Sequence, residues 1–143
     1  MSDPEETARR SAEAMWADDA ASQALGIRLL AVGPGTATLE MTVRKDMVNG
    51  HGIGHGGFTF SLADSAFAFA CNSYNRRTVA HTCRITYLAP TTLGDVLVAA
   101  ATEREREGRD GVYDVVVRNA DRVVAEFVGT SKEIRGSLFE EGL

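Results

Sequence analysis

The 143-residue sequence predicts a single α+β domain in which one antiparallel β-sheet wraps around one long buried helix. Three observations support this prediction. The stretch 57–74 is apolar around nearly the whole helical circumference, which is typical of a buried helix. Segments on both sides of it alternate apolar and polar residues, as half-buried strands do. The links between the last strands are so short that neighbouring strands must run antiparallel.

Residues before this helix predict two kinds of element. Residues 4–24 are polar with scattered apolar side chains and indicate one or two short surface helices. Residues 26–44 predict a β-hairpin, because the sequence Val-Gly-Pro-Gly at 32–35 favours a turn. After that turn the apolar side chains fall on alternate positions: Ala37, Leu39, Met41 and Val43.

Residues after the helix predict four strands, at about 78–90, 95–107, 111–119 and 122–134. In the first of these, Val79, Cys83, Ile85 and Tyr87 are expected on one face, and Pro90 ends the strand. Residues 136–143 are expected to be a loose tail. A helix that is apolar on every side needs more cover than one sheet provides, so a second subunit is expected to close the remaining face.

The bulk composition narrows the class of protein. The formal charge of −5 argues against non-specific binding to nucleic acid or to an anionic membrane, so neither is expected as a partner. The first ten residues lack the apolar region of a secretory signal, and no apolar run is long enough to span a bilayer. The two cysteines, Cys71 and Cys83, are expected to be free thiols. A cytoplasmic protein is the expectation.

Asp64 is the only formally charged side chain from Met47 to Tyr74. Transfer of an isolated carboxylate out of water costs several kcal/mol, so its placement on a buried helix requires a partner or a use. One interpretation is that it caps a backbone group or reaches solvent through a gap. The interpretation we favour is an active-site base or nucleophile in a pocket partly closed to water.

Five glycines precede the helix: Gly50, Gly52, Gly54, Gly56 and Gly57. Glycine permits close backbone approach to a ligand. The last two lie where the helix begins, and free N–H groups at a helix start suit the oxyanion that forms when a carbonyl is attacked. The alternative is a flexible loop without a function.

The histidines raise the question of a metal site. His51 and His55 are four residues apart, but the glycines between them argue against helical spacing, and an HExxH motif is absent. A site built from these histidines with His81 and Asp64 is therefore not expected, and we predict no metal. His55 is interpreted either as a residue that orients the loop or polarises a carbonyl, or as a structural histidine.

The segment "NGHGIGHGGFTFSLADSAFAFACNS", followed by "ITYLAP" and then "GD", resembles the hotdog-fold acyl-CoA thioesterases, and among them most the phenylacetate-pathway PaaI branch. The resemblance extends from about Ala21 to Ile134. It implies a long helix wrapped by an antiparallel sheet. It also implies that Asp64 is the catalytic acid, that the Gly56 N–H binds the thioester carbonyl, and that His55 and Asn49 shape the site.

The same resemblance implies that subunits pair so that Asp64 faces the partner's HGG loop, and that the pairs assemble into tetramers. One departure from the family concerns the strand after the helix, where some relatives have a serine that holds water. Ala80 or a neighbour occupies that place here, so Thr82 or His81 is the possible substitute.

The implied function is hydrolysis of aryl-acetyl thioesters, such as phenylacetyl-CoA and its ring-hydroxylated forms, in phenylacetate catabolism. Substrate contacts are expected from Gly57, Phe58, Phe60, Thr82 and Arg84, whereas Phe67 is expected in the core. Coenzyme A is part of the substrate, and no cofactor is expected. Asp64 can act as a general base or as a nucleophile. The alternatives are a non-enzymatic acyl-CoA-binding protein and a hotdog hydratase or dehydratase.

Overall fold

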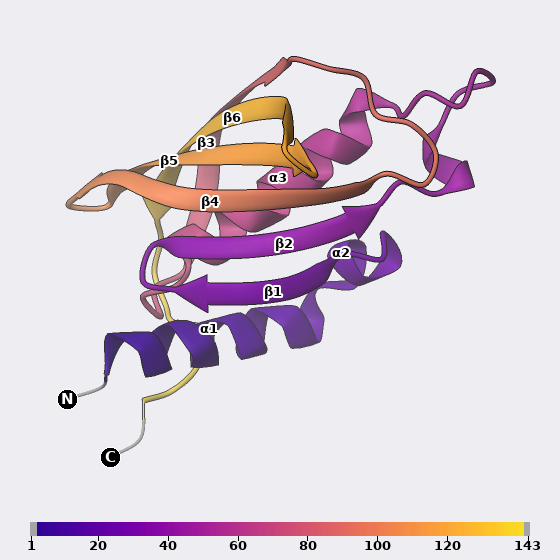
Figure 1. The fold of residues 1–143 in the computed structure, drawn as a ribbon. Coiled ribbons are helices and arrows are strands. Elements are labelled where there is room, and N and C mark those ends of the chain that lie inside the picture. The colour runs from indigo at the N-terminus through magenta and orange to yellow at the C-terminus, as the bar shows by residue number, and fades with distance from the viewer. Residues whose placement is uncertain (1–2, 142–143) are drawn as a thin grey trace.

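The computed structural model describes residues 3–141, in which a six-stranded antiparallel sheet curves around a central helix (Figure 1). In chain order the elements are α1 (Pro4–Asp18), α2 (Ala20–Ala24), β1 (Arg28–Gly33), β2 (Thr36–Thr42), the short 3-10 helix η1 (Lys45–Met47), α3 (Gly56–Cys71), β3 (Thr78–Tyr87), β4 (Val96–Glu107), β5 (Asp110–Asn119) and β6 (Arg122–Glu133). The strand order is β1-β2-β4-β5-β6-β3. This arrangement confirms the predicted fold class.

Helix α3 fills the concave side of the sheet, and its buried residues form the middle of the hydrophobic core. Phe67 packs against Tyr113 and Phe127 with ring centroids 5.7 Å from each. The backbone of β6 approaches this ring closely, since a Cβ atom added at Gly129 would come within 2.8 Å of it. The expectation that Phe67 is a core residue is therefore confirmed.

The predicted hairpin is present, and its turn is shorter than expected. Gly33 pairs with Thr36, so only Pro34 and Gly35 form the turn. Gly35 has a φ of +71°, and the order proline then glycine suits a turn whose second central residue requires a positive φ. The other predicted strands agree with the structure to within a few residues, with β3 ending at Tyr87 rather than near Pro90.

Strand β3 forms one edge of the sheet and pairs only with β6 among the described residues. Its pairing shifts between Ala80 and Thr82, which leaves His81 as an extra residue in a β-bulge. Because of this bulge Val79 pairs with Lys132, whereas Cys83 pairs with Gly129 on the core side. The prediction that Val79 shares a face with Cys83, Ile85 and Tyr87 is therefore wrong for Val79.

The other edge of the sheet, β1, lies beside α1 (Figure 1). Helix α1 begins at a capping residue, Asp3, whose side chain accepts a hydrogen bond from the Glu5 N–H. It turns Ala8, Ser11 and Ala12 toward the body of the protein, where all three are buried. None of the helices in residues 3–141 is long and apolar enough to cross a membrane.

The segment after β6 forms no helix or strand, yet it is held in place. The buried Asn75 side chain accepts hydrogen bonds from the Leu138 and Phe139 N–H groups and donates one to the Phe139 carbonyl. Arg10 of α1 stacks on the Phe139 ring at 4.2 Å from its centroid. The sequence predicted a loose tail over residues 136–143, and these contacts show that residues 138–139 are instead held against the protein. Residues 142–143 lie outside the described part of the chain.

Candidate active site

The glycine-rich segment before α3 is an ordered loop. The Asn49 side-chain oxygen accepts hydrogen bonds from the N–H groups of His51 and Ile53, at 2.9 and 3.1 Å. Further along, the Gly54 N–H donates to the Thr91 carbonyl and the His55 N–H to the Met47 carbonyl. A Cβ atom at Gly54 would lie 2.1 Å from the Thr91 hydroxyl. The loop therefore enters α3 along one defined path, and the Asn49 side chain is part of what holds it.

The first turn of α3 leaves its backbone donors free. His55 is the N-cap residue, and its side chain makes no capping hydrogen bond. Within residues 3–141 the N–H groups of Gly56 and Gly57 have no acceptor. These groups lie at the positive end of the helix dipole, where a negative charge is stabilised. The arrangement can bind an oxyanion, which is the role predicted for Gly56.

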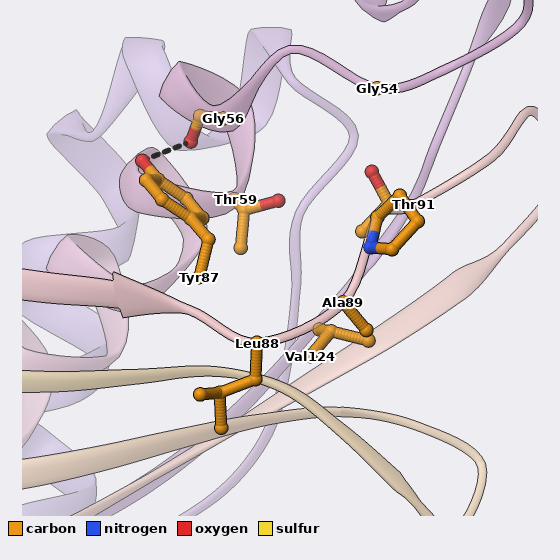
Figure 2. A pocket seen from close by; sticks show the side chains of 9 residues that line it. Gly54, Gly56, Thr59, Tyr87, Leu88, Ala89, Thr91 and Val124 are labelled. Carbon is orange, nitrogen blue, oxygen red and sulfur yellow. Dashed lines mark hydrogen bonds between the residues drawn. The ribbon is translucent and has the colours of Figure 1, made fainter.

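A cavity of about 460 Å³ lies beside these donors. Figure 2 shows the first turn of α3 on one side of it and the segment after β3 on the other. Its lining comprises Gly54, Gly56, Thr59, Tyr87, Leu88, Ala89, Pro90, Thr91 and Val124. Most of these groups are apolar or backbone, so the cavity suits an apolar acyl group whose carbonyl reaches the helix N-terminus.

Two residues of this lining, Thr59 and Tyr87, were not predicted as site residues. Thr59 is only 3% exposed, and its side chain lines the cavity (Figure 2). The Tyr87 hydroxyl donates to the Gly56 carbonyl at 2.9 Å (Figure 2). Thr59 lies one helical turn after Gly56, so the i, i+3 spacing was a usable signal. No comparable signal exists for Tyr87, which is distant in sequence.

Asp64 is a partly buried carboxylate near the middle of α3. Within residues 3–141 it forms no hydrogen bond and no ion pair. Burial raises the pKa of Asp64 above its ordinary value. Its charge in turn contributes to raising the pKa of Cys71 on α3 and of Cys83 on β3, although burial is the main cause for both thiols. Asp64 therefore lies on the side of α3 that faces the free edge strand.

A single chain does not bring the predicted catalytic groups together. Gly56 and Asp64 are eight residues apart on one helix, which separates them by about 12 Å along its axis. Asp64 does not line the cavity beside Gly56. That distance is too long for both groups to act on one carbonyl within the same chain.

The predicted substrate contacts are also dispersed. Gly57 is exposed at the start of α3, and a Cβ atom there would meet nothing within 4 Å. Phe58 and Phe60 pack partly against the core, and Phe60 contacts the Phe127 ring edge-on at 5.5 Å. Neither lines the cavity.

Thr82 and Arg84 lie on the sheet face opposite to α3. The Thr82 hydroxyl hydrogen-bonds the Thr130 hydroxyl at 2.6 Å, so in this chain it is already paired. Arg84 lines a second cavity with outward-facing residues of β3–β6 such as Asp114 and Glu126. The described residues contain no cluster of three or more His, Cys, Asp or Glu side chains that could hold a metal ion.

Comparison with known proteins places this geometry in a family. The profile of the thioesterase superfamily matches residues 51–126. The chain belongs to this superfamily. It is 44% identical over 133 residues to the acyl-coenzyme A thioesterase PaaI of Escherichia coli (strain K12), which covers 92% of this chain and 95% of the relative. The E. coli PaaI structure, described as coming from the phenylacetic acid degradation operon, matches with a TM-score of 0.92 and 43% identity. The match covers 94% of this chain and 99% of the E. coli chain.

Two further solved structures are similar over most of the chain. A mutant of the phenylacetic acid degradation protein PaaI from Thermus thermophilus is 39% identical, with a TM-score of 0.76 and coverage of 79% and 97%. A protein from Streptococcus mutans UA159, solved bound to acetyl CoA, is 25% identical, with a TM-score of 0.73 and coverage of 78% and 90%. The hotdog fold and the PaaI-type family predicted from the sequence are confirmed.

Proposed function

We infer that this protein hydrolyses acyl-CoA thioesters, with aryl-acetyl groups such as phenylacetyl and ring-hydroxylated phenylacetyl as the acyl portion. The observation that carries this inference is the pair of free N–H groups at the start of α3, which open beside an apolar cavity. Membership of the thioesterase superfamily and 44% identity to a PaaI thioesterase support the reaction. The operon named for the E. coli relative supports the aryl-acetyl substrate and a role in phenylacetate catabolism.

The chemistry requires few groups. A thiolate with a pKa near 8.5 is a good leaving group, so little acid assistance is needed. In the proposed reaction Asp64, ionised, either removes a proton from a water that attacks the carbonyl carbon or attacks that carbon itself. The C–S bond of the tetrahedral intermediate then breaks, and coenzyme A leaves as the thiolate. The first route gives the free acid directly, whereas the second gives a mixed anhydride with Asp64 that water hydrolyses to the free acid and the Asp64 carboxylate. The Gly56 N–H stabilises the intermediate oxyanion by roughly 3 kcal/mol. No cofactor is needed for these steps.

We propose that two chains complete each site. The separation of Gly56 and Asp64 within one helix, about 12 Å of axial rise, is bridged if each cavity takes its carboxylate from a partner. The free edge of β3 supports this arrangement. It is ten residues long, and none of its side chains is fully buried in one chain. Unpaired strand edges of this length readily pair with a second strand. Antiparallel pairing of β3 with its copy would join two sheets, and two such dimers would form a tetramer. The cytoplasmic location stays a prediction.

The test is thiol release from a panel of acyl-CoAs, measured for the wild-type protein and for Asp64→Asn. We expect the wild type to prefer aryl-acetyl substrates and the variant to lose about 10³-fold in kcat, because its amide can neither accept the proton nor attack. A wild type that binds these compounds without releasing coenzyme A would support a binding protein instead. Addition or loss of water in an enoyl substrate without thiol release would support a hydratase.

A further inference from the structure

We propose that Tyr87 is a positioning residue that holds the Gly56–Gly57 peptide, and thereby sets the direction of a free N–H group at the start of α3. This inference rests on the proposed function, which assigns the Gly56 N–H to the oxyanion, and it adds the neighbouring Gly57 N–H as a second donor. Tyr87 itself is not proposed to touch the reacting atoms. It acts through the Gly56–Gly57 peptide, whose N–H is proposed to contact them.

The first observation is the hydrogen bond from the Tyr87 hydroxyl to the Gly56 carbonyl oxygen, at 2.9 Å. The Gly56 carbonyl and the Gly57 N–H belong to one planar peptide group. A hydrogen bond that fixes the oxygen therefore also fixes the direction of the Gly57 N–H. The first peptides of a helix lack the full set of intrahelical hydrogen bonds and fray easily, so an added bond has most effect there.

The second observation is steric and independent of the hydroxyl. A Cβ atom at Gly56 would lie 2.8 Å from Cζ of Tyr87 and 3.0 Å from its hydroxyl oxygen. Gly56 does not have a positive φ, so conformational freedom is not the reason for glycine here. At Gly57, by contrast, an added Cβ meets nothing within 4 Å. The tyrosine ring thus explains why position 56 in particular holds glycine.

The third observation is the place of Tyr87 in the fold. It is the last residue of β3, the free edge strand, and it is 31 residues away from Gly56 in sequence. Its ring stands between that strand and the first turn of α3 and lines the cavity (Figure 2). The hydrogen bond therefore connects the strand proposed to pair with a partner to the peptide proposed to bind the oxyanion.

Tyr87→Phe tests the proposal because it keeps the ring and removes only the hydroxyl. We expect kcat to fall about fivefold, the effect of one neutral hydrogen bond, with KM for the acyl-CoA nearly unchanged. The matched control is Tyr74→Phe, which loses a hydroxyl bond to Glu103 at the other end of α3. That variant should lose thermal stability without a loss of kcat.

A spectroscopic readout separates positioning from a general structural role. In protein labelled with ¹⁵N-glycine, Tyr87→Phe should shift the Gly57 amide resonance and speed its hydrogen exchange, whereas Tyr74→Phe should do neither. An unchanged Gly57 resonance together with an unchanged kcat would overturn the proposal. If the wild type releases no thiol from any acyl-CoA, the proposed function fails, and the Gly57 resonance still decides whether Tyr87 positions this peptide.

Discussion

The two ends of α3 are built in opposite ways. At the C-terminal end, the Asn72 side chain donates to the Ala68 and Thr78 carbonyls and accepts from the Thr78 N–H. Ser73 next to it accepts from the Gly35 N–H and donates to the Ala70 carbonyl. At the N-terminal end, the side chain of the N-cap residue, His55, makes no capping hydrogen bond. The same helix is thus closed with side-chain hydrogen bonds at one end and left open at the other.

This difference separates stability from function. Backbone groups without partners cost about 1–3 kcal/mol each when they are buried, so an uncapped end is maintained only where water or a ligand takes the capping role. The open end of α3 borders a cavity, and its backbone is held by Tyr87 through the carbonyl rather than through the donors. Substitutions at the two ends should therefore change different measured quantities.

The largest expected effect is at the open end. Gly56→Pro removes the N–H itself, and proline is well tolerated at the first position of a helix. The preceding residue, His55, has a ψ of 133°, which suits a residue before proline. Gly56→Ala adds the same Cβ atom against Tyr87 but keeps the N–H. We expect kcat of Gly56→Pro to be about 10²-fold below that of Gly56→Ala, as for loss of one oxyanion donor. Equal kcat values for the two variants would show that the N–H takes no part in the reaction.

At the closed end we expect the reverse. Asn72→Ala removes three hydrogen bonds to backbone groups from a side chain that is 5% exposed. The variant should lose about 2–3 kcal/mol of stability, measured as the free energy of unfolding in urea. The kcat of the folded fraction should stay at the wild-type value. A large fall in kcat with unchanged stability would contradict the division between the two ends.

Asp64 lies between the two ends of α3, and its carboxylate should lower the stability of the folded protein while it serves the proposed reaction. Burial raises its pKa, so the folded state favours the protonated carboxyl. Below the pKa of the unfolded state both states are protonated, and as pH rises through the raised pKa the folded state loses stability because it must carry a buried charge. Asp64→Asn should therefore be more stable than the wild type at pH 7, because the amide carries no charge into the partly buried position. Near pH 3 the difference in stability between the variant and the wild type should disappear.

Thermal unfolding of both proteins between pH 3 and pH 7 checks this expectation. An Asp64→Asn variant that is less stable than the wild type at pH 7 would show that the ionised carboxylate has a stabilising partner.

The pattern of the sequence predicted most of the fold because the relevant signals are local. The apolar run indicated α3, the alternation indicated the strands, and the short turns indicated antiparallel pairing. The end of α3 was placed too late, at Tyr74, because the helix ends at Cys71 through hydrogen bonds of the Asn72 side chain to the Ala68 and Thr78 carbonyls, which the residue pattern does not reveal. The face of Val79 was wrong because nothing in the residue types of β3 signals the bulge at His81.

The site was predictable where residue type alone carries the chemistry. A lone Asp64 on an apolar helix and glycines at its start were sufficient to indicate these two candidates. The contact between Tyr87 and Gly56 was not predictable, because it depends on the register of β3 and on the curvature of the sheet around α3. The distance between Gly56 and Asp64 follows from helix geometry, and the proposal that two chains share each site gains support from the free edge of β3, which the structure adds.

The sharing of each site between two chains is tested most directly by mixing two inactive variants. Asp64→Asn keeps the Gly56 N–H, and Gly56→Pro keeps the carboxylate, so a mixed dimer contains one intact site and one site with both defects. After co-refolding in equal amounts, half of the dimers are mixed and half of their sites are intact, so thiol release should recover to about a quarter of the wild-type rate. Mass spectrometry of the intact assemblies shows whether mixed dimers have formed. Mixed dimers that remain as inactive as either variant alone would contradict a site built from two chains.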